Sequence, residues 1–397
     1  MASERHFTDI RPARPAPWRD PRVRSVVFQA LTLIVVASLA AYIVSNTISN
    51  LRSQGIAAGF GFLDRTAGFD IGFTLIPYSA VSTYGRAFWV GLLNTLLVSA
   101  LGIVLATIFG FVIGLARLST NWLVARLALV YIETVRNIPL LLQLLFWYVA
   151  VLQALPHPRD SVVIADTVYL NNRGLTTPLA VFGEGAGAIL VALVIALVAV
   201  VLLGRWAKRR REATGQQFHT VLVSLGVLIG LPLLTFAALG APLSFEHAEM
   251  GRFRLVGGLT LVPEFVALLA GLSIYTAAFI AEIVRAGVVA VSHGQIEAAS
   301  ALGLRRTQTL RLVVIPQALR VIIPPLTSQY LNLTKNSSLA VAIGYPDLVS
   351  IVAGTTLNQT GQAIEAIALT MAVYLTLSLL ISLFMNWYNR RMALVER

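Results

Sequence analysis

The sequence predicts an all-α, polytopic membrane protein with about eight transmembrane helices. Hydrophobic residues make up 57% of the 397 residues and charged residues only 12%, whereas soluble domains carry about 25% charged residues. Apolar runs near 20 residues long, the length that crosses a bilayer, recur along the chain between polar segments. Most of the 30 lysines and arginines lie in alternate segments, as the positive-inside rule requires.

The N-terminal region contains one predicted helix and two polar flanks. Residues 1–24 carry six arginines and four prolines, which predicts a cytoplasmic tail. The run from Val26 to Val44 is apolar enough to span. A signal peptide is an alternative, because Ser38-Leu39-Ala40 weakly suits cleavage, but the apolar run continues past that point. We therefore expect residues 25–86 to form an extra N-terminal transmembrane helix followed by a periplasmic segment, which is rich in glycine and aromatic residues.

The other spans follow from the apolar runs, with two of them near the minimum length. They are expected at 87–116, 127–152, 187–204, 219–240, 261–288, 317–333 and 364–386. The charge distribution places both termini and the polar interval 293–316 in the cytoplasm.

Ionisable residues inside the 127–152 span point to function. Glu133 and Arg136 are spaced i, i+3 and share a helix face, on which Gln143 is expected two turns further along. Arg136 would lie roughly 13 Å deep at 1.5 Å per residue. A charge there costs at least about 2.5–3.5 kcal/mol and normally faces a cavity or a partner. Pro139 is expected to loosen the helix nearby. A structural ion pair and a substrate contact both remain open for Arg136.

Two further polar sites lie in later spans. Glu282 and Arg285 follow Tyr275 and Thr276, and their position near the cytoplasmic end favours bracing of the next loop over substrate contact. In Thr334-Lys335-Asn336-Ser337-Ser338 an apolar helix meets polar residues, and unwound backbone is tolerated at membrane depth only where it is buried or lines a cavity. Asp347 is interpreted as part of a loop.

The interval 293–316 predicts two short helices at a bend. Ser292 and Gln295 have capping-box spacing, and a carboxylate at Glu297 suits a first turn. Gly303 stands where a left-handed residue would end the first helix. A second helix is expected from about Thr307, with Pro316 ending it and redirecting the chain.

The residues of this interval resemble the EAA loop of ABC importer permeases. Its pattern is Glu-Ala-Ala, three residues, Gly, nine residues and Ile-x-Leu-Pro. Glu297, Ala298, Ala299, Gly303 and Pro316 match it, with Val313 and Ile315 as mild departures. The run from Glu133 to Gln143 resembles a signature of the polar amino acid permeases. The resemblance covers about 87–155 and 260–390, the five-helix core of a type I ABC importer permease, and the layout is similar to the general L-amino-acid permeases.

The resemblance implies a domain at 87–390, with the EAA loop at 293–316 and an insertion at 156–259 that carries two extra helices. It also implies import of L-amino acids, broad in specificity, across a bacterial inner membrane. The expected partners are a second permease (a paralogue), two ATPase subunits, a periplasmic amino-acid-binding protein and membrane lipid, but no nucleic acid. ATP and Mg would be bound by the ATPase subunits.

The residues expected along the substrate path combine a cation with amide, hydroxyl and carboxylate groups that suit a zwitterion. They are Glu133, Arg136, Asn137, Gln143, Tyr275, Thr276, Lys335, Asn336 and Ser337. The coupling residues expected to reach the ATPase are Glu297, Ala298, Ala299, Gly303 and Pro316.

Other function classes fit less well. An ion-driven secondary transporter would predict internal inverted repeats, and the sequence gives no sign of one. An embedded enzyme would need a catalytic constellation, but GxSxG and HExxH motifs are absent. Neither lysine follows a glycine, so there is no Walker A loop, and a chain without cysteine has no thiolate metal site. We therefore expect a non-catalytic subunit without a cofactor or metal of its own.

Overall fold

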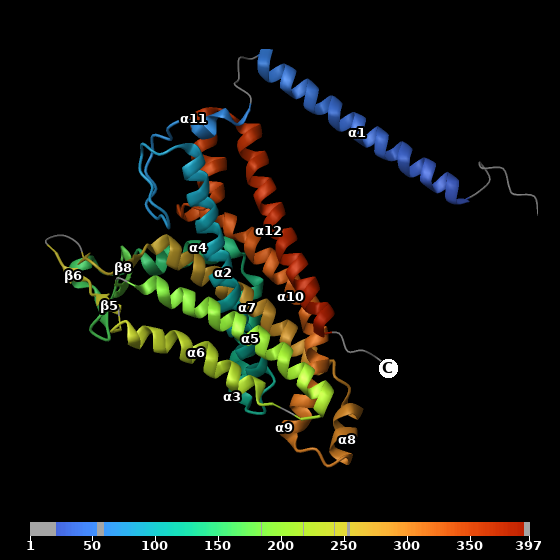
Figure 1. Cartoon of the computed structure of the whole chain (residues 1–397). Coiled ribbons are helices and arrows are strands. Elements are labelled where there is room, and N and C mark those ends of the chain that lie inside the picture. Colours follow the sequence, from blue (N-terminus) through green and yellow to red (C-terminus); the bar gives the residue numbers. More distant parts are fainter. Residues whose placement is uncertain are drawn as a thin grey trace, which may run out of the picture.

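The computed structural model describes residues 21–53, 59–183, 185–216, 218–241, 243–251 and 255–392 as a set of long helices (Figure 1). Seven helices in these ranges are long and apolar enough to cross a membrane, or eight if one sharply bent pair counts as a single span. The predicted class, a polytopic helical membrane protein, is therefore confirmed.

The centre of the fold is the contact between α2 (Tyr84–Arg117) and α7 (Pro263–Val289). Glycines at 110 and 114 allow the two helices to approach closely. A Cβ atom built on Gly114 would lie 2.7 Å from the carbonyl oxygen of Ala281, closer than real side chains come. Small residues four apart are the usual means of close helix packing in a membrane. Around this contact pack α10 (Ile315–Asn336) and α12 (Ala363–Met392).

The predicted span 127–152 is broken. It consists of α3 (Trp122–Asn137), then α4 (Leu140–Leu145) with the π-helical η3 (Phe146–Leu152), at 106° to each other. Ile138 adopts extended backbone angles (φ −100°, ψ 129°), the conformation favoured before a proline. Pro139 therefore turns the chain instead of merely loosening a straight helix. The expectation that Gln143 shares a helix face with Arg136 is wrong for the same reason.

The helix after the EAA loop is longer than predicted. Helix α9 (Arg306–Thr309), the π-helical η5 (Leu310–Val314), α10 and the 3-10 segment η6 (Ser337–Ile343) form one stretch of 38 residues. Pro316 neither ends nor redirects it, so that expectation is wrong. Proline is tolerated near the start of a regular α-helix, and the π-helical turn directly before α10 provides such a start. The predicted span 317–333 was too short because it was limited by Pro316 and by the polar run that begins at Thr334.

Two segments precede the core. Helix α1 (Pro21–Ser53) lies apart from the other helices in Figure 1, and its described side chains are mostly exposed. The following segment contains η2 (Phe60–Asp64), where the ring of Phe62 is buried against Tyr84. The backbone N–H of Gly59 donates to Glu365 Oε1 at 2.6 Å. This segment therefore packs on the first residues of α2 and α12.

The region 156–259 contains two helices and short strands. Helices α5 (Ala186–Thr214) and α6 (Thr220–Ala238) pack side by side (Figure 1). The sequence did not predict the strands, because segments of two to four residues give no usable alternation. An antiparallel sheet has the order β1 (Val162–Ile164), β2 (Val168–Asn171), β3 (Gly174–Thr177), β8 (Leu259–Leu261), and two pairs join β4 (Leu179–Phe182) to β5 (Leu243–Glu246) and β6 (Glu249–Met250) to β7 (Leu255–Val256).

Candidate functional site

Arg136 lies at the exposed end of α3, beside α7. Its guanidinium carbon is 5.2 Å from the ring centroid of Phe279, and the ring of Phe279 is 4.9 Å from that of Tyr275. The fold thus joins Arg136 and Tyr275 through one aromatic ring that the sequence did not single out. Phe279 stands four residues after Tyr275, the spacing that places two side chains on one helix face, so a signal for it existed.

Glu133 is exposed and belongs to none of the ion pairs that the described residues form. Arg136 therefore rests against an aromatic face and not on the carboxylate one turn earlier. A cation over a ring keeps its charge and its free N–H groups available to a second partner.

Asn137 and Gln143 support the broken backbone. The side-chain amide of Asn137 donates to the carbonyl of Glu133 at 2.7 Å. The amide of Gln143 donates to the carbonyls of Val135 and Ile138, at 2.8 and 2.9 Å. Terminal carbonyls of a helix lack partners inside the helix, so these amides satisfy them where the chain turns. Gln143 is only 8% exposed, and its amide hydrogens are committed to the break.

The remaining predicted path residues divide between surface and interior. Thr276 and Ser337 are buried, and the Ser337 hydroxyl donates to the carbonyl of Thr334 at 2.8 Å. Lys335 is exposed in the last turn of α10, and Asn336 is half-buried. The structure therefore leaves Arg136, Asn137, Glu133 and Lys335 on exposed surfaces, whereas Gln143, Thr276 and Ser337 face the packed interior.

A buried polar cluster centres on Asp347, which sequence reasoning had treated as loop chemistry. This residue stands between the candidate spans Arg306–Ile343 and Ala363–Arg391 and is 0% exposed. Its carboxylate accepts from the backbone N–H of Ser350 at 2.8 Å and from the Tyr374 hydroxyl at 3.3 Å. Burial raises the pKa of Asp347 from 3.8 to about 7.

The same cluster includes Asn94 and Thr95 of α2. The Asn94 amide donates to the carbonyls of Phe73 and Pro346, at 3.0 and 2.9 Å. Thr95 Oγ1 accepts from the backbone N–H of Leu348 at 3.0 Å. Two adjacent polar residues in an otherwise apolar run could have been recognised in the sequence as a polar site, but the sequence does not show which distant residues they contact. The cluster fixes the segment 344–348 against the central helix.

The second charged pair lies in α7. Arg285 Nε donates to Glu282 Oε2 at 2.9 Å, and about a third of each side chain is exposed. The two residues pair within one helix, one turn before the helix ends at Val289, and the charges of Arg136 and Arg117 also act on the Glu282 carboxylate. Bracing of the next loop by this pair stays a prediction.

The EAA loop forms two helices, as expected, with different capping. Helix α8 (His293–Ala301) begins after Ser292, but the Ser292 hydroxyl makes no capping bond, so the predicted capping box is not formed. Glu297 hydrogen-bonds His293 Nδ1 at 2.9 Å instead. A glutamine does cap a helix start in this loop, but at α9: Gln308 Oε1 accepts from the backbone N–H of Arg305 at 2.9 Å.

The bend between the helices has the predicted backbone conformation. Gly303 has φ +73°, in the left-handed region that glycine adopts without cost. Ala299 is the buried residue of α8, Ala298 is exposed, and Leu302 is 81% exposed at the bend.

Comparison with known proteins identifies the family. Residues 200–394 match the family described as "Binding-protein-dependent transport system inner membrane component". The chain is 56% identical to the general L-amino acid transport system permease protein AapQ of Rhizobium johnstonii, over 95% of this chain and 94% of that protein. It is also 56% identical to the putative amino-acid ABC transporter permease protein YhdX of Escherichia coli, over 95% and 96%.

A third relative, the glutamate/glutamine/aspartate/asparagine transport system permease protein BztB of Rhodobacter capsulatus, is 44% identical over 95% of this chain and 96% of that protein. A solved amino acid ABC transporter with histidines aligns over 78% of this chain and 95% of that one, with a TM-score of 0.46 and 22% identity. The chain therefore belongs to the permeases of binding-protein-dependent ABC importers of the polar amino acid class, and it resembles the general L-amino-acid permeases.

Proposed function

We propose that this chain imports a broad range of L-amino acids across the bacterial inner membrane as the permease subunit of an ATP-driven complex. The observation that carries the proposal is its 56% identity, over nearly its whole length, to a permease named for general L-amino acid transport. In this proposal a periplasmic binding protein delivers the amino acid, and two ATPase subunits bind and hydrolyse ATP. Both termini and the EAA loop lie in the cytoplasm.

A second permease subunit completes the path. The α3–α4 break leaves Glu133 and Arg136 exposed on α3, and Leu142 and Phe146 after the break are exposed as well. Charged groups at membrane depth need a cavity or a protein partner, because lipid leaves them unsolvated. A partner permease that covers this surface would enclose a polar path. The additions outside the five-helix core favour a paralogue as that partner.

Arg136 is the residue proposed to bind the α-carboxylate of the substrate. It is permanently charged, and guanidinium groups bind carboxylates through two parallel hydrogen bonds. Glu133 forms no ion pair with it, and Phe279 supports it from one side. The Glu282 carboxylate attracts it but is hydrogen-bonded to Arg285, so the N–H groups of Arg136 remain available. Asn137, Tyr275, Asn336 and Lys335 would contribute at greater distance, and the buried amide and hydroxyls of Gln143, Thr276 and Ser337 would hold the path in shape.

The test compares Arg136→Met with the double variant Arg136→Met, Glu133→Leu in the reconstituted complex. If the arginine binds substrate, both variants assemble and hydrolyse ATP but lose uptake. If the arginine only balances the glutamate, the double variant should transport, because replacing a whole ion pair with apolar residues is often tolerated. Near-normal uptake by the double variant would overturn the assignment.

The partners are tested by purifying the chain from its native membrane and identifying the proteins that remain bound. We expect a second, distinct permease, an ATPase and an amino-acid-binding protein. Recovery of this chain with copies of itself as the sole permease would contradict the paralogue. Absence of any ATPase would contradict the ATP-driven mechanism.

A further inference from the structure

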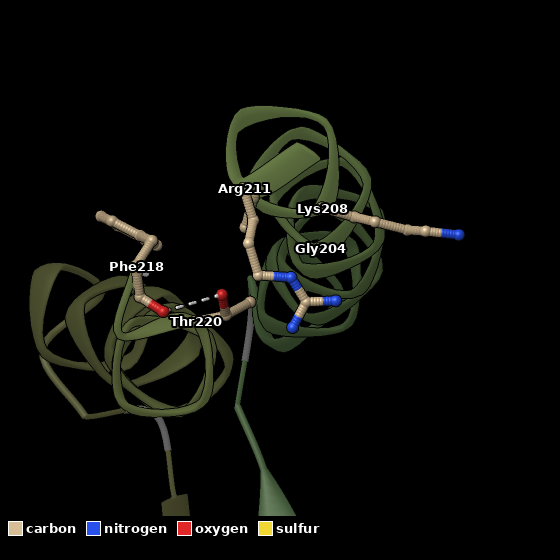
Figure 2. Close-up of a pocket in the computed structure, with 6 residues that line it drawn as sticks. Gly204, Lys208, Arg211, Phe218 and Thr220 are labelled. Carbon is tan, nitrogen blue, oxygen red and sulfur yellow. Dashed lines mark hydrogen bonds between the residues drawn. The ribbon is translucent and has the colours of Figure 1, made fainter. Parts of the chain in front are cut away.

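A basic cavity opens where α5 and α6 meet at their connecting turn. Its volume is about 370 Å³, and no residue of α3, α7 or the proposed path is among the residues that line it. Figure 2 shows the two helices with Arg211 turned toward Thr220, whereas Lys208 extends away from α6. The lining residues are Gly204, Ala207, Lys208, Arg211, Phe218 and Thr220.

Positive charge is concentrated at this end of α5. Arg205, Lys208, Arg209, Arg210 and Arg211 occupy fewer than two turns, with Glu212 as the adjacent carboxylate. The Lys208–Glu212 pair is long, at 3.9 Å, and mostly exposed, so it neutralises little. Arg210 is held by Gln216 at 3.0 Å and by the ring of Trp206. Among the described residues the Arg211 guanidinium has neither an ion-pair nor a hydrogen-bond partner, although the Arg211 carbonyl accepts from the Gly215 N–H at 3.0 Å.

The helix lengths place this charge at the level of lipid headgroups. The 19 residues of α6 span about 28 Å, close to the thickness of the hydrocarbon core. Strands β4 and β5 pair just outside the far ends of the two helices, so those ends lie at one level. The additional length of α5, which has 29 residues, therefore projects beyond the start of α6 and out of the hydrocarbon.

Two features favour a phospholipid over a soluble anion. Trp206 packs edge-on against Phe218, with ring centroids 5.2 Å apart, and aromatic rings of this kind gather at the membrane interface. Below the cavity, α5 and α6 present apolar side chains away from the rest of the chain, among them Leu202 and Leu225. A headgroup phosphate in the cavity would leave its acyl chains along this surface.

We propose that the cavity between Arg211, Gly204 and Thr220 binds the phosphate headgroup of an anionic phospholipid. Basic pockets between transmembrane helices are suited to such headgroups. The site lies at the same end of the molecule as α8 and α9 (Figure 1), so the lipid belongs to the cytoplasmic leaflet if the proposed orientation is right. The binding itself does not depend on the transport proposal.

The test measures phosphatidylglycerol retained by the purified assembly, using native mass spectrometry after exchange into detergent with added phosphatidylglycerol or phosphatidylcholine. Arg211→Gln should reduce retained phosphatidylglycerol at least about ten-fold, because it removes the charge-assisted hydrogen bonds of the guanidinium to the phosphate as well as one cation. Gly204→Leu should do the same without changing charge, because a Cβ there meets open space and the side chain would fill the cavity.

The matched control is Arg209→Gln, which removes the same charge from the same helix at a residue that does not line the cavity. It should reduce retained phosphatidylglycerol by no more than about five-fold, the general contribution of one cation near an anionic surface. An equal loss in all three variants, or no loss in Gly204→Leu, would overturn the site and leave only general attraction between charges. Displacement of the lipid by millimolar inorganic phosphate would overturn the lipid assignment in favour of a soluble anion.

Discussion

Replacing Gly303 with valine should uncouple the EAA loop from the ATPase while leaving the helices inserted. Gly303 has φ +73°, and a Cβ atom built there has no neighbour within 4 Å. The side chain would therefore not clash, and the cost is confined to the backbone. A non-glycine residue pays roughly 1–2 kcal/mol in the left-handed region, and a β-branched residue pays more. This energy lowers the population of the native bend about 5- to 30-fold.

The assay is ATP hydrolysis stimulated by substrate-loaded binding protein, measured with the complex in proteoliposomes. Gly303→Val should insert and assemble but lose most of the stimulation. Two controls isolate the cause. Gly303→Asn should retain it, because asparagine tolerates the left-handed region, and Gly294→Ala should be neutral, because that glycine of α8 has open space and no positive φ. Full stimulation of the valine variant, or equal loss in Gly294→Ala, would refute the reasoning.

Three further predictions concern stability. Gly114→Ala should lower the thermal midpoint of the purified complex, because its Cβ would lie 2.7 Å from the Ala281 oxygen and overpacking costs about 1–3 kcal/mol. The control Gly226→Ala should leave the midpoint unchanged, because a Cβ at Gly226 meets open space. Gln143→Leu strips two backbone carbonyls of their donors, so it should cost about 1–3 kcal/mol, and an unchanged midpoint would count against the amide's role. The pKa of Asp347 is raised to about 7, so the folded state holds a proton that the unfolded chain loses near pH 4. The free energy of unfolding should therefore decrease as the pH rises from about 4 to about 7. Asp347→Asn should remove that part of the pH dependence.

Features set by the bilayer were predictable from the sequence. A span must be long and apolar, so the positions of α2, α7 and α12 could be read from single runs of residues. The break at Ile138 and Pro139 was underestimated because proline within an apolar run is compatible with both a mild kink and a sharp turn. The choice between them depends on packing against α7. At Pro316 the effect of proline was overestimated: the helix was expected to end there but continues. The π-helical turn before it has no sequence signature.

In the candidate site, too, features set by neighbouring residues could be predicted from the sequence, but contacts between distant residues could not. The left-handed bend at Gly303 followed from a pattern within a few residues. The orientation of Gln143 depended on the break, and the partner of Arg136 was a ring on another helix. The cluster around Asp347 joins residues about 250 positions apart, a pairing that one sequence does not encode in readable form. Short-range geometry was therefore predictable, whereas contacts between helices were not.

The central claim is that this chain imports amino acids as part of an ATP-driven complex. The most direct test is uptake of radiolabelled L-amino acids into proteoliposomes that contain the chain with the proteins purified alongside it, with ATP on the side that the EAA loop faces. The account predicts accumulation of several different L-amino acids, which requires both ATP and the binding protein. Accumulation that follows an ion gradient and needs neither ATP nor the binding protein would contradict it.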